Sequence, residues 1–290
     1  RRSSDLATGL PKYQKDDKGN IVYQDSWKRP IPDADKDVDY AAHGYKSLDE
    51  LVRWRLYNRT GAGLMAELGS HQLDACSIFL GKKHPLAVTG VGGKFFYKDD
   101  REVDDHVFTM FEFPGAEESD RIVVTYSSIN TNSFDGYGEQ VMGSKGTMIV
   151  AGEKEILLFK EAGNATLSKT TSVTMETQGK KPVLETSPST AGPSAATAIG
   201  GLATADPSRG YREELEHFAY CIRHGDASNF HADKDHQPRC KGEVALADAV
   251  IALTTNIAMR ENRRIEFDPK WFDYADDATP DGSTVIAKRS

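Results

Sequence analysis

The feature that most restricts the fold is a change of hydrophobic period at Ala87. From there to Phe159, apolar and polar residues alternate in six strand-like runs: AVTGVGGKFFY, HVFTMFEF, RIVVTYSSI, YGEQVMG, TMIVA and EILLF. The segments between them, such as KDDRE, PGAEESD and GSKG, are short and rich in turn residues. Parallel strands need a crossover of about a dozen residues or more, so these connections predict an antiparallel, meandering sheet. A further segment, SVTME, is expected to add an edge strand.

Helices are predicted on both sides of this strand region. In SLDELVRWRLY, Ser47 can cap a short helix while Glu50 reaches back. A longer helix is expected from about Leu64 to Leu80, ending near Gly81. Two more follow in YREELEHFAYCIRHG and GEVALADAVIALTTNIAMREN, and then a short strand in RRIEFDP. Helices, a sheet and helices again predict an α+β fold, in which the helices pack on one face of the sheet.

The predicted domain organisation is simple. Residues 1–46 are polar, interrupted by proline and charged in DADKDVD, so an extended segment is expected there. Residues 47–290 are expected to form one domain, with a flexible connection at about 185–210, where Ser, Thr, Ala, Gly and Pro predominate. The chain opens with RRSSDLATGLPKY, without Met or an apolar signal region, and we expect a processed product or a fragment. A targeting segment would lie upstream of Arg1, so the sequence does not choose between a cytoplasmic and an exported protein.

The charge and composition exclude several partners. A net charge of −8 argues against nucleic acid and against an anionic membrane surface. No run of the sequence approaches the roughly 18 apolar residues of a membrane span. The three cysteines form no CxxC pair, so disulfides are not implied. A small neutral or cationic substrate is the better expectation.

Neither a nucleotide site nor a metal site is predicted. The glycine clusters GVGGK, GYG and GSKG do not precede a helix, as phosphate-binding loops do, so no cofactor-binding residue is expected in this chain. The segment CIRHGDASNFHADKDHQPRC contains seven possible metal ligands, but their spacings match no common zinc pattern. These ligands are Cys221, His224, His231, Asp233, Asp235, His236 and Cys240. We interpret the segment as a polar loop between helices.

The segment GAGLMAELGSHQLD carries the main candidate for chemistry. On a helix, Glu67, His71 and Asp74 share one face, beside an apolar stripe formed by Leu64, Leu68, Ala75 and Phe79. One reading is structural, in which His71 is simply satisfied by Glu67 one turn earlier. The other is catalytic, because a carboxylate can orient an imidazole that passes a proton at neutral pH. Arg55, just upstream, could donate to a polyhydroxylated or anionic ligand.

Several segments, in order, resemble the second domain of the Gfo/Idh/MocA oxidoreductases, the family of glucose-fructose oxidoreductase and inositol dehydrogenase. They are WRLYNRTGAGLMAELGSHQLD with LGKKHPLAVTGVGG, GSKGTMIV, YREELEHFAYCIRHG and EVALADAVIALTTNIAMRENRRIEFDP. The resemblance covers nearly the whole chain beyond residue 45. The segment WRLYNRTGAGLMAELGSHQLDA, together with the DPKWFDY tail, is similar to sequences of the family branch that is common in planctomycetes.

The resemblance implies a fold, a cofactor and partners. The fold is an open, mostly antiparallel sheet, as in dihydrodipicolinate reductase, whose free face forms a homo-oligomer interface. NAD or NADP is bound mainly by a Rossmann domain that this chain lacks, together with its EKP lysine. The substrate is a sugar or cyclitol.

The resemblance also implies roles for individual residues. The family's Asp-x-x-x-His corresponds to Glu67 and His71, with His71 as the acid/base and Glu67 in place of the usual Asp. Substrate contacts are expected from Arg55, Tyr57, Asp74 and Arg212.

The expected function is therefore the substrate-binding domain of an NAD(P)-dependent oxidoreductase acting on a secondary alcohol, and the fragment alone is expected to be inactive. The alternatives are an NAD-dependent redox-neutral glycosidase or isomerase of the same fold, and a non-catalytic oligomerisation or binding module.

Overall fold

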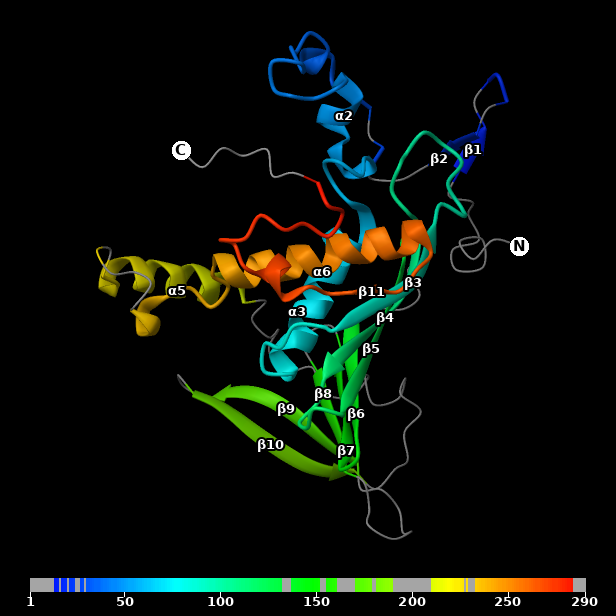
Figure 1. Ribbon diagram of the computed structural model, residues 1–290. Coiled ribbons are helices and arrows are strands. Elements are labelled where there is room, and N and C mark those ends of the chain that lie inside the picture. Colours follow the sequence, from blue (N-terminus) through cyan, green and yellow to red (C-terminus); the bar gives the residue numbers. More distant parts are fainter. Residues whose placement is uncertain are drawn as a thin grey trace. The chain divides into compact units, whose positions relative to one another are not determined.

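A computed structural model gives the structure of the chain as two compact units (Figure 1). The first unit comprises residues 1–135 and 242–290, and the second comprises 136–241. The structure describes residues 13–15, 17–19, 21–23, 27–28, 30–131, 137–151, 155–160, 170–178, 181–189, 210–226, 228 and 233–283. Of the predicted flexible connection at about 185–210, residues 190–209 lie outside these ranges, and residues 185–189 belong to a strand, β10 (Lys181–Ser189). The expectation that 47–290 form one domain stays a prediction.

The first unit contains a four-stranded antiparallel sheet in the order β11-β3-β4-β5. Its strands are β3 (Ala87–Gly93), β4 (His106–Pro114), β5 (Arg121–Ile129) and β11 (Ile265–Glu266). Along β4, Val107 and Phe111 are buried whereas Phe108 and Met110 are exposed. This alternation means that only one face of the sheet is covered, as the period of two predicts.

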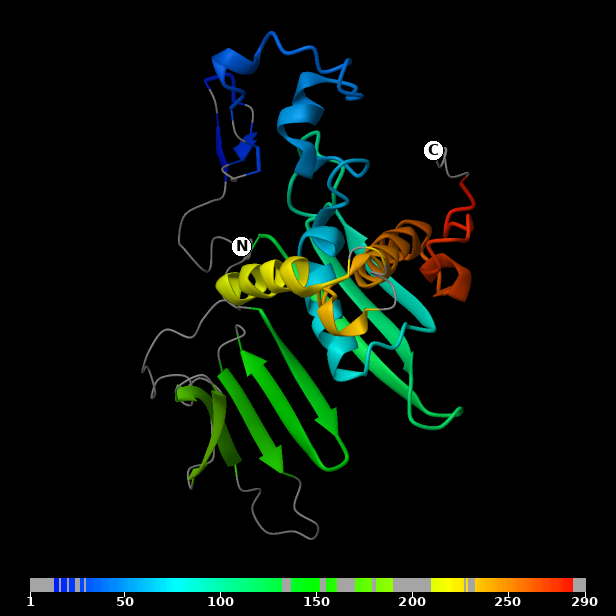
Figure 2. The ribbon, with the colours of Figure 1, turned by 90° about the vertical axis from the view of Figure 1, so that its left-hand side faces the viewer.

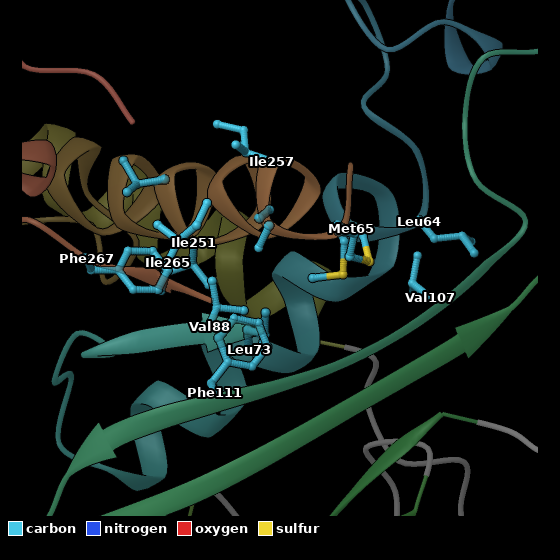
Figure 3. Close-up of a cluster of buried hydrophobic side chains, with 14 of the residues drawn as sticks. Leu64, Met65, Leu73, Val88, Val107, Phe111, Ile251, Ile257, Ile265 and Phe267 are labelled. Atoms are coloured by element: carbon cyan, nitrogen blue, oxygen red, sulfur yellow. The ribbon is translucent and has the colours of Figure 1, made fainter. Parts of the chain in front are cut away.

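The π-helical turn η3 (Met65–Gly69), α3 (Ser70–Phe79), α6 (Gly242–Glu261) and the 3-10 turn η5 (Pro269–Phe272) pack on that covered face. Figures 1 and 2 show α3 and α6 beside the sheet, whereas α2 (Leu48–Val52) lies away from it and is followed by the 3-10 turn η2 (Trp54–Leu56). Ser47 caps α2 as predicted, accepting a hydrogen bond from the backbone N–H of Glu50 at 3.0 Å. Figure 3 shows Leu64, Met65 and Leu73 meeting β-strand residues on one side and α6 residues on the other.

The helix α6 supplies much of this core. Its buried residues are Ala247, Val250, Ile251, Ala252, Thr254, Thr255, Ile257, Ala258 and Met259. Within the described residues it is the one helix long and apolar enough, by length and composition, to cross a membrane. That corrects the expectation that no run of the sequence approaches such a span, but core helices pass the same test, and α6 packs against β3. The expectation that the protein has no membrane partner stays a prediction.

The loop between β3 and β4 is organised by a buried carboxylate. Asp105, which is 0% exposed, accepts hydrogen bonds from the backbone N–H groups of Phe95 at 2.9 Å, Phe96 at 2.9 Å and Tyr97 at 2.8 Å. Its Oδ1 also contacts Nδ1 of His106. The adjacent Asp104 differs, because burial and then the charge of Asp105 raise its pKa.

The second unit contains a five-stranded antiparallel sheet in the order β10-β9-β8-β7-β6. Its strands are β6 (Gly138–Gly143), β7 (Gly146–Ala151), β8 (Glu155–Lys160), β9 (Thr170–Gln178) and β10 (Lys181–Ser189), followed by α5 (Tyr211–His224) and the 3-10 turn η4 (Lys234–His236). The segment SVTME was expected at an edge, but it lies within β9, which pairs on both sides because β10 continues the meander.

The N-terminal segment contains local structure within the expected extended region. A two-stranded hairpin pairs β1 (Tyr13–Lys15) with β2 (Ile21–Tyr23), and the 3-10 turn η1 covers Asp33–Asp35. A hairpin needs only a turn and a few paired residues, so a polar segment can form one without an apolar period.

Candidate functional site

The candidate site is built on the connection between η2 and the π-helical turn η3. Ala62 and Gly63 have φ values of 55° and 68°, in the left-handed region. The amide of Asn256, on α6, donates to the backbone carbonyl of Ala62 at 2.8 Å. A Cβ at Gly61 would lie 2.7 Å from Cα of Arg55, so no larger residue fits there. The start of the following helix is therefore held tightly against its surroundings.

The turn η3 changes which side of the helix is buried. The sequence predicted Leu64, Leu68, Ala75 and Phe79 as the apolar stripe, and Leu64 is buried, but Leu68 and Phe79 are 46% and 43% exposed. After Leu64, the buried positions are Met65, Gly69, Leu73 and Ser77. A π turn contains an extra residue, which shifts the face presented by everything after it. A Cβ at Gly69 would lie 3.2 Å from the ring of Tyr126, so the glycine permits the close approach of helix and sheet.

His71 is exposed on α3, two residues after the end of this turn. Within the described residues, His71 forms no hydrogen bond and no ion pair. The geometry therefore does not support the structural interpretation, in which Glu67 is the hydrogen-bond partner of His71. Glu67 instead accepts a hydrogen bond from Nε of Arg55 at 3.1 Å, and its side chain is 18% exposed. The guanidinium of Arg55 also lies over the ring of Trp54, 4.8 Å from its centroid. The imidazole is accessible, and Arg55 is the partner of the carboxylate.

Asp74, one turn after His71, is held by the turn that ends α3. It forms an ion pair with Lys82, and the hydroxyl of Ser77 donates to its backbone carbonyl at 2.9 Å. Gly81 and Lys82 both have positive φ, 73° and 61°. For lysine that conformation costs about 1–2 kcal/mol. The strained turn returns the chain so that the Lys82 ammonium lies against Asp74.

Asp248, on α6, is a member of this group that sequence reasoning missed. Burial, and next the charge of Asp74, raise the pKa of Asp248 to about 6, while Lys82 and His71 act in the opposite direction. It is separated from Asp74 by more than 170 residues, so no local spacing connects them. A signal was present nevertheless, since Asp248 is the one ionisable residue between Val244 and Met259.

Two of the expected substrate contacts are engaged elsewhere. The hydroxyl of Tyr57 donates to Asp49, and burial is the main cause that raises its pKa, followed by that hydrogen bond. Arg212 belongs to the second unit, where its Nε donates to Glu216 at 2.7 Å on the exposed surface of α5. The structure therefore brings together Arg55 with Glu67, and Asp74 with Lys82.

The segment with seven possible metal ligands lies in the second unit. His236 pairs with Asp233 at 2.9 Å, and the rings of His224 and His236 are stacked with centroids 6.4 Å apart. His231 lies outside the described residues. Among the residues that are described, no group of three or more His, Cys, Asp or Glu side chains could hold a metal ion. The absence of a metal site stays a prediction.

The uncovered face of the first unit's sheet is largely apolar. Its exposed residues include Val91 at 60%, Phe108 at 53%, Met110 at 43% and Val123 at 57%. A shallow hollow of about 540 Å³ opens on this face, lined in part by Val91, Phe108 and Met110. An exposed apolar surface of this kind marks an interaction site in many proteins.

Part of the chain that contains the candidate site matches a known protein family. Residues 38–149 match the family model of the GFO/IDH/MocA C-terminal domain. The match includes α2, η3, α3 and the sheet strands β3, β4 and β5, and therefore Glu67, His71 and Asp74. It does not reach Asp248 or Arg212. No curated protein sequence matches the chain.

Several solved structures that resemble the chain are oxidoreductases, and one is a transcriptional regulator, Gal80p. An inositol dehydrogenase homolog from Azotobacter vinelandii, solved with NADH and myo-inositol, is 15% identical with a TM-score of 0.50, over 78% of this chain and 54% of that one. Levoglucosan dehydrogenase, with NADH and L-sorbose, is 18% identical with a TM-score of 0.44, over 74% and 53%. Aldose-aldose oxidoreductase from Caulobacter crescentus, with glycerol, is 18% identical with a TM-score of 0.42, over 74% and 50%.

The chain has the fold of the GFO/IDH/MocA C-terminal domain, helices on an open antiparallel sheet, and it spans about half the length of these structures. Among the described residues, two of the glycine clusters lack the geometry of a dinucleotide-binding loop. The cluster GVGG lies in β3 and GSKG forms the β6–β7 turn, so neither presents backbone N–H groups at the start of a helix.

Proposed function

We propose that this chain is the substrate-binding domain of an NAD(P)-dependent Gfo/Idh/MocA oxidoreductase that acts on a secondary alcohol of a sugar or cyclitol. The observation that carries the proposal is the accessible His71 within the segment that matches the family model, beside the Arg55–Glu67 pair. The planctomycete-type branch stays a prediction.

In this proposal His71 exchanges the proton of the substrate hydroxyl. When the alcohol is oxidised, its O–H proton passes to the free imidazole nitrogen while the carbon loses hydride, and a carbonyl remains. A bound nicotinamide would supply the acceptor for that hydride. In this proposal the cofactor is bound mainly by a domain outside residues 1–290. Related structures contain NADH, and one is named a putative NADPH-dependent oxidoreductase, so we leave the choice between NAD and NADP to experiment.

The roles of the neighbouring residues follow from their contacts. Arg55 keeps donors beyond the one that Glu67 accepts, and a planar guanidinium can bind two hydroxyl groups of a polyol. Glu67 thus fixes Arg55, and its predicted role in orienting His71 remains to be tested. Asp74 lies on the same helix and can accept a substrate hydroxyl. Tyr57 and Arg212 remain proposed substrate contacts of the intact protein.

The apolar face of the first unit's sheet is proposed as the homo-oligomer interface. Val91, Phe108, Met110 and Val123 would be removed from water by a second copy. No role in nucleic-acid or membrane binding is proposed.

The test uses the complete gene product with NAD⁺ and a panel that includes myo-inositol and D-glucose. We expect absorbance of the reduced nicotinamide to accumulate, and His71→Ala to lower kcat about 10²- to 10⁴-fold. His43→Ala, at another exposed histidine, is the matched control and should leave kcat unchanged. Full activity of His71→Ala would contradict the proposal and favour a binding module. Glycoside cleavage or isomerisation without net reduction of NAD⁺ would favour the redox-neutral alternative. Residues 1–290 alone should show no steady turnover.

A further inference from the structure

Trp54 presents its indole to solvent at the start of η2. The residue is 40% exposed, whereas Trp27 and Trp271 pack against the core. The backbone under the indole is held in place, because the hydroxyl of Thr60 donates to the carbonyl of Trp54 at 2.7 Å. A Cβ at Gly61 would lie 2.9 Å from the same carbonyl, so the loop closes tightly on it. An exposed aromatic side chain is therefore carried by a fixed segment of backbone.

The next side chain, that of Arg55, packs on this indole. Its guanidinium carbon lies 4.8 Å from the centroid of the Trp54 ring, and its Nε donates to Glu67 at 3.1 Å. The Arg55 side chain is nevertheless 48% exposed, and within the described residues its terminal Nη nitrogens form no hydrogen bond. An indole, a guanidinium and a carboxylate thus form one continuous surface, which we call the Trp54–Arg55–Glu67 patch.

The patch lies close to His71 along the chain. Glu67 belongs to η3, and His71 follows four residues later on α3. Four residues correspond to about 6 Å of helical rise. The contacts from Trp54 to Arg55 and from Arg55 to Glu67 therefore connect the indole to the segment that carries the imidazole. A ligand of the size of one monosaccharide spans this separation.

A cyclic polyol has two kinds of surface that match the patch. The C–H groups on one face of its ring form an apolar surface that packs on an indole. The hydroxyl groups at its rim accept from a guanidinium and donate to a carboxylate. Small-molecule sites combine these elements, an apolar wall and a few oriented polar groups. An acyclic polyol has the hydroxyl groups but no rigid face, and it loses more rotational freedom when it binds.

We propose that Trp54 is a specificity-determining residue of the His71 site, whose indole receives the C–H face of a cyclic polyol while Arg55 and Glu67 bind hydroxyl groups at its rim. The inference rests on the proposed function and narrows its substrate class to ring-shaped sugars or cyclitols. Trp54 contributes to binding and takes no part in the transfer of the proton or the hydride. Its removal should therefore change KM and leave kcat unchanged.

The first test measures kinetics in the complete gene product with NAD⁺, and compares myo-inositol and D-glucose with D-glucitol, an acyclic polyol. Trp54→Ala should raise KM for the cyclic compounds about tenfold, the equivalent of about 1.4 kcal/mol, and leave KM for D-glucitol unchanged. Trp54→Phe keeps a flat ring and should restore most of the loss. Trp54→Leu lacks a flat ring, so it should resemble Trp54→Ala and replaces that variant if it does not fold. Tyr40→Ala is the matched control, because Tyr40 is an exposed aromatic residue of the same unit.

The second test measures binding without turnover, by the tryptophan fluorescence of the complete gene product as myo-inositol is added. The emission should change in the wild type and stay constant in Trp54→Phe, which lacks the reporting indole. If a cyclic polyol is oxidised but Trp54→Ala has the wild-type KM, or raises KM equally for D-glucitol, only this inference fails. If His71→Ala is fully active while Trp54→Ala raises KM as stated, the catalytic proposal fails and the cyclic-polyol site stands. If no cyclic polyol is bound or oxidised, both proposals fail.

Discussion

Replacement of Asp105 by asparagine tests how much of the first unit depends on one buried carboxylate. The side chain accepts three backbone N–H groups from residues 95–97, and the asparagine that replaces it has one acceptor oxygen instead of two. The oxygen can keep the two bonds to Phe96 and Tyr97. Its amide nitrogen then faces the N–H of Phe95, while the contact with His106 survives because the amide can donate to Nδ1.

The expected loss follows from these contacts. One buried N–H left without an acceptor costs about 1–3 kcal/mol, and each of the two remaining bonds loses about 1 kcal/mol when its acceptor loses the charge. Asp105→Asn should therefore lower the free energy of unfolding of the first unit by about 3–5 kcal/mol.

Tryptophan fluorescence during urea unfolding measures this loss selectively. All three tryptophans, Trp27, Trp54 and Trp271, belong to the first unit. The control is Asp104→Asn, one residue away, because its carboxylate is disfavoured in the folded state. Removing that charge should leave the free energy of unfolding at pH 7 equal or higher. Equal losses in the two variants, or a loss below about 1 kcal/mol for Asp105→Asn, would refute the reasoning.

Further predictions concern the helices and the turn before them. Leu73→Ala should lower the free energy of unfolding by about 2–5 kcal/mol in the same assay, because the side chain is 1% exposed and a cavity would remain. Ser47→Ala should cost about 1 kcal/mol by removing the cap of α2. Gly63→Ala should destabilise by at least 1 kcal/mol, since φ is 68° and the new Cβ would lie 3.1 Å from Val103. The raised pKa of Asp248 means that the folded state binds its proton more tightly than the unfolded state does. The free energy of unfolding of the wild type should therefore fall relative to that of Asp248→Asn as pH rises from about 4 through 6, and then level off. Parallel curves of unfolding free energy against pH for the two proteins would contradict this.

The sequence predicted the antiparallel sheet because the period of two is a local property. Val107 and Phe111 are buried, and Phe108 is exposed, as alternation requires. The sequence did not predict that the strands divide into sheets of four and five within the described residues. Alternation reports which side of a strand is buried but carries no information on which strand lies beside it.

The candidate site could be predicted only where its residues are close in sequence. The spacing of Glu67, His71 and Asp74 is visible directly, and the structure places all three near the surface of one helical segment. The partner of Glu67 proved to be Arg55, and that of Asp74 is Lys82, which is reached through two residues of positive φ. Asp248 depends on the packing of α6 against α3, a contact that no single-helix pattern contains.

The extra residue in η3 has a consequence for insertions and deletions in this segment. Upstream, the chain is tied to α6 through the carbonyl of Ala62, and downstream Leu73 is fixed in the core. Deleting Ala66 would restore ordinary helical winding and rotate α3 by about 100° relative to the chain before it. Either Leu73 would leave the core or Met65 would, and the imidazole of His71 would point in another direction. The number of residues between Ala62 and His71, more than their types, therefore sets the direction of the imidazole. Relatives in which the imidazole points the same way should have the same number of residues in this segment.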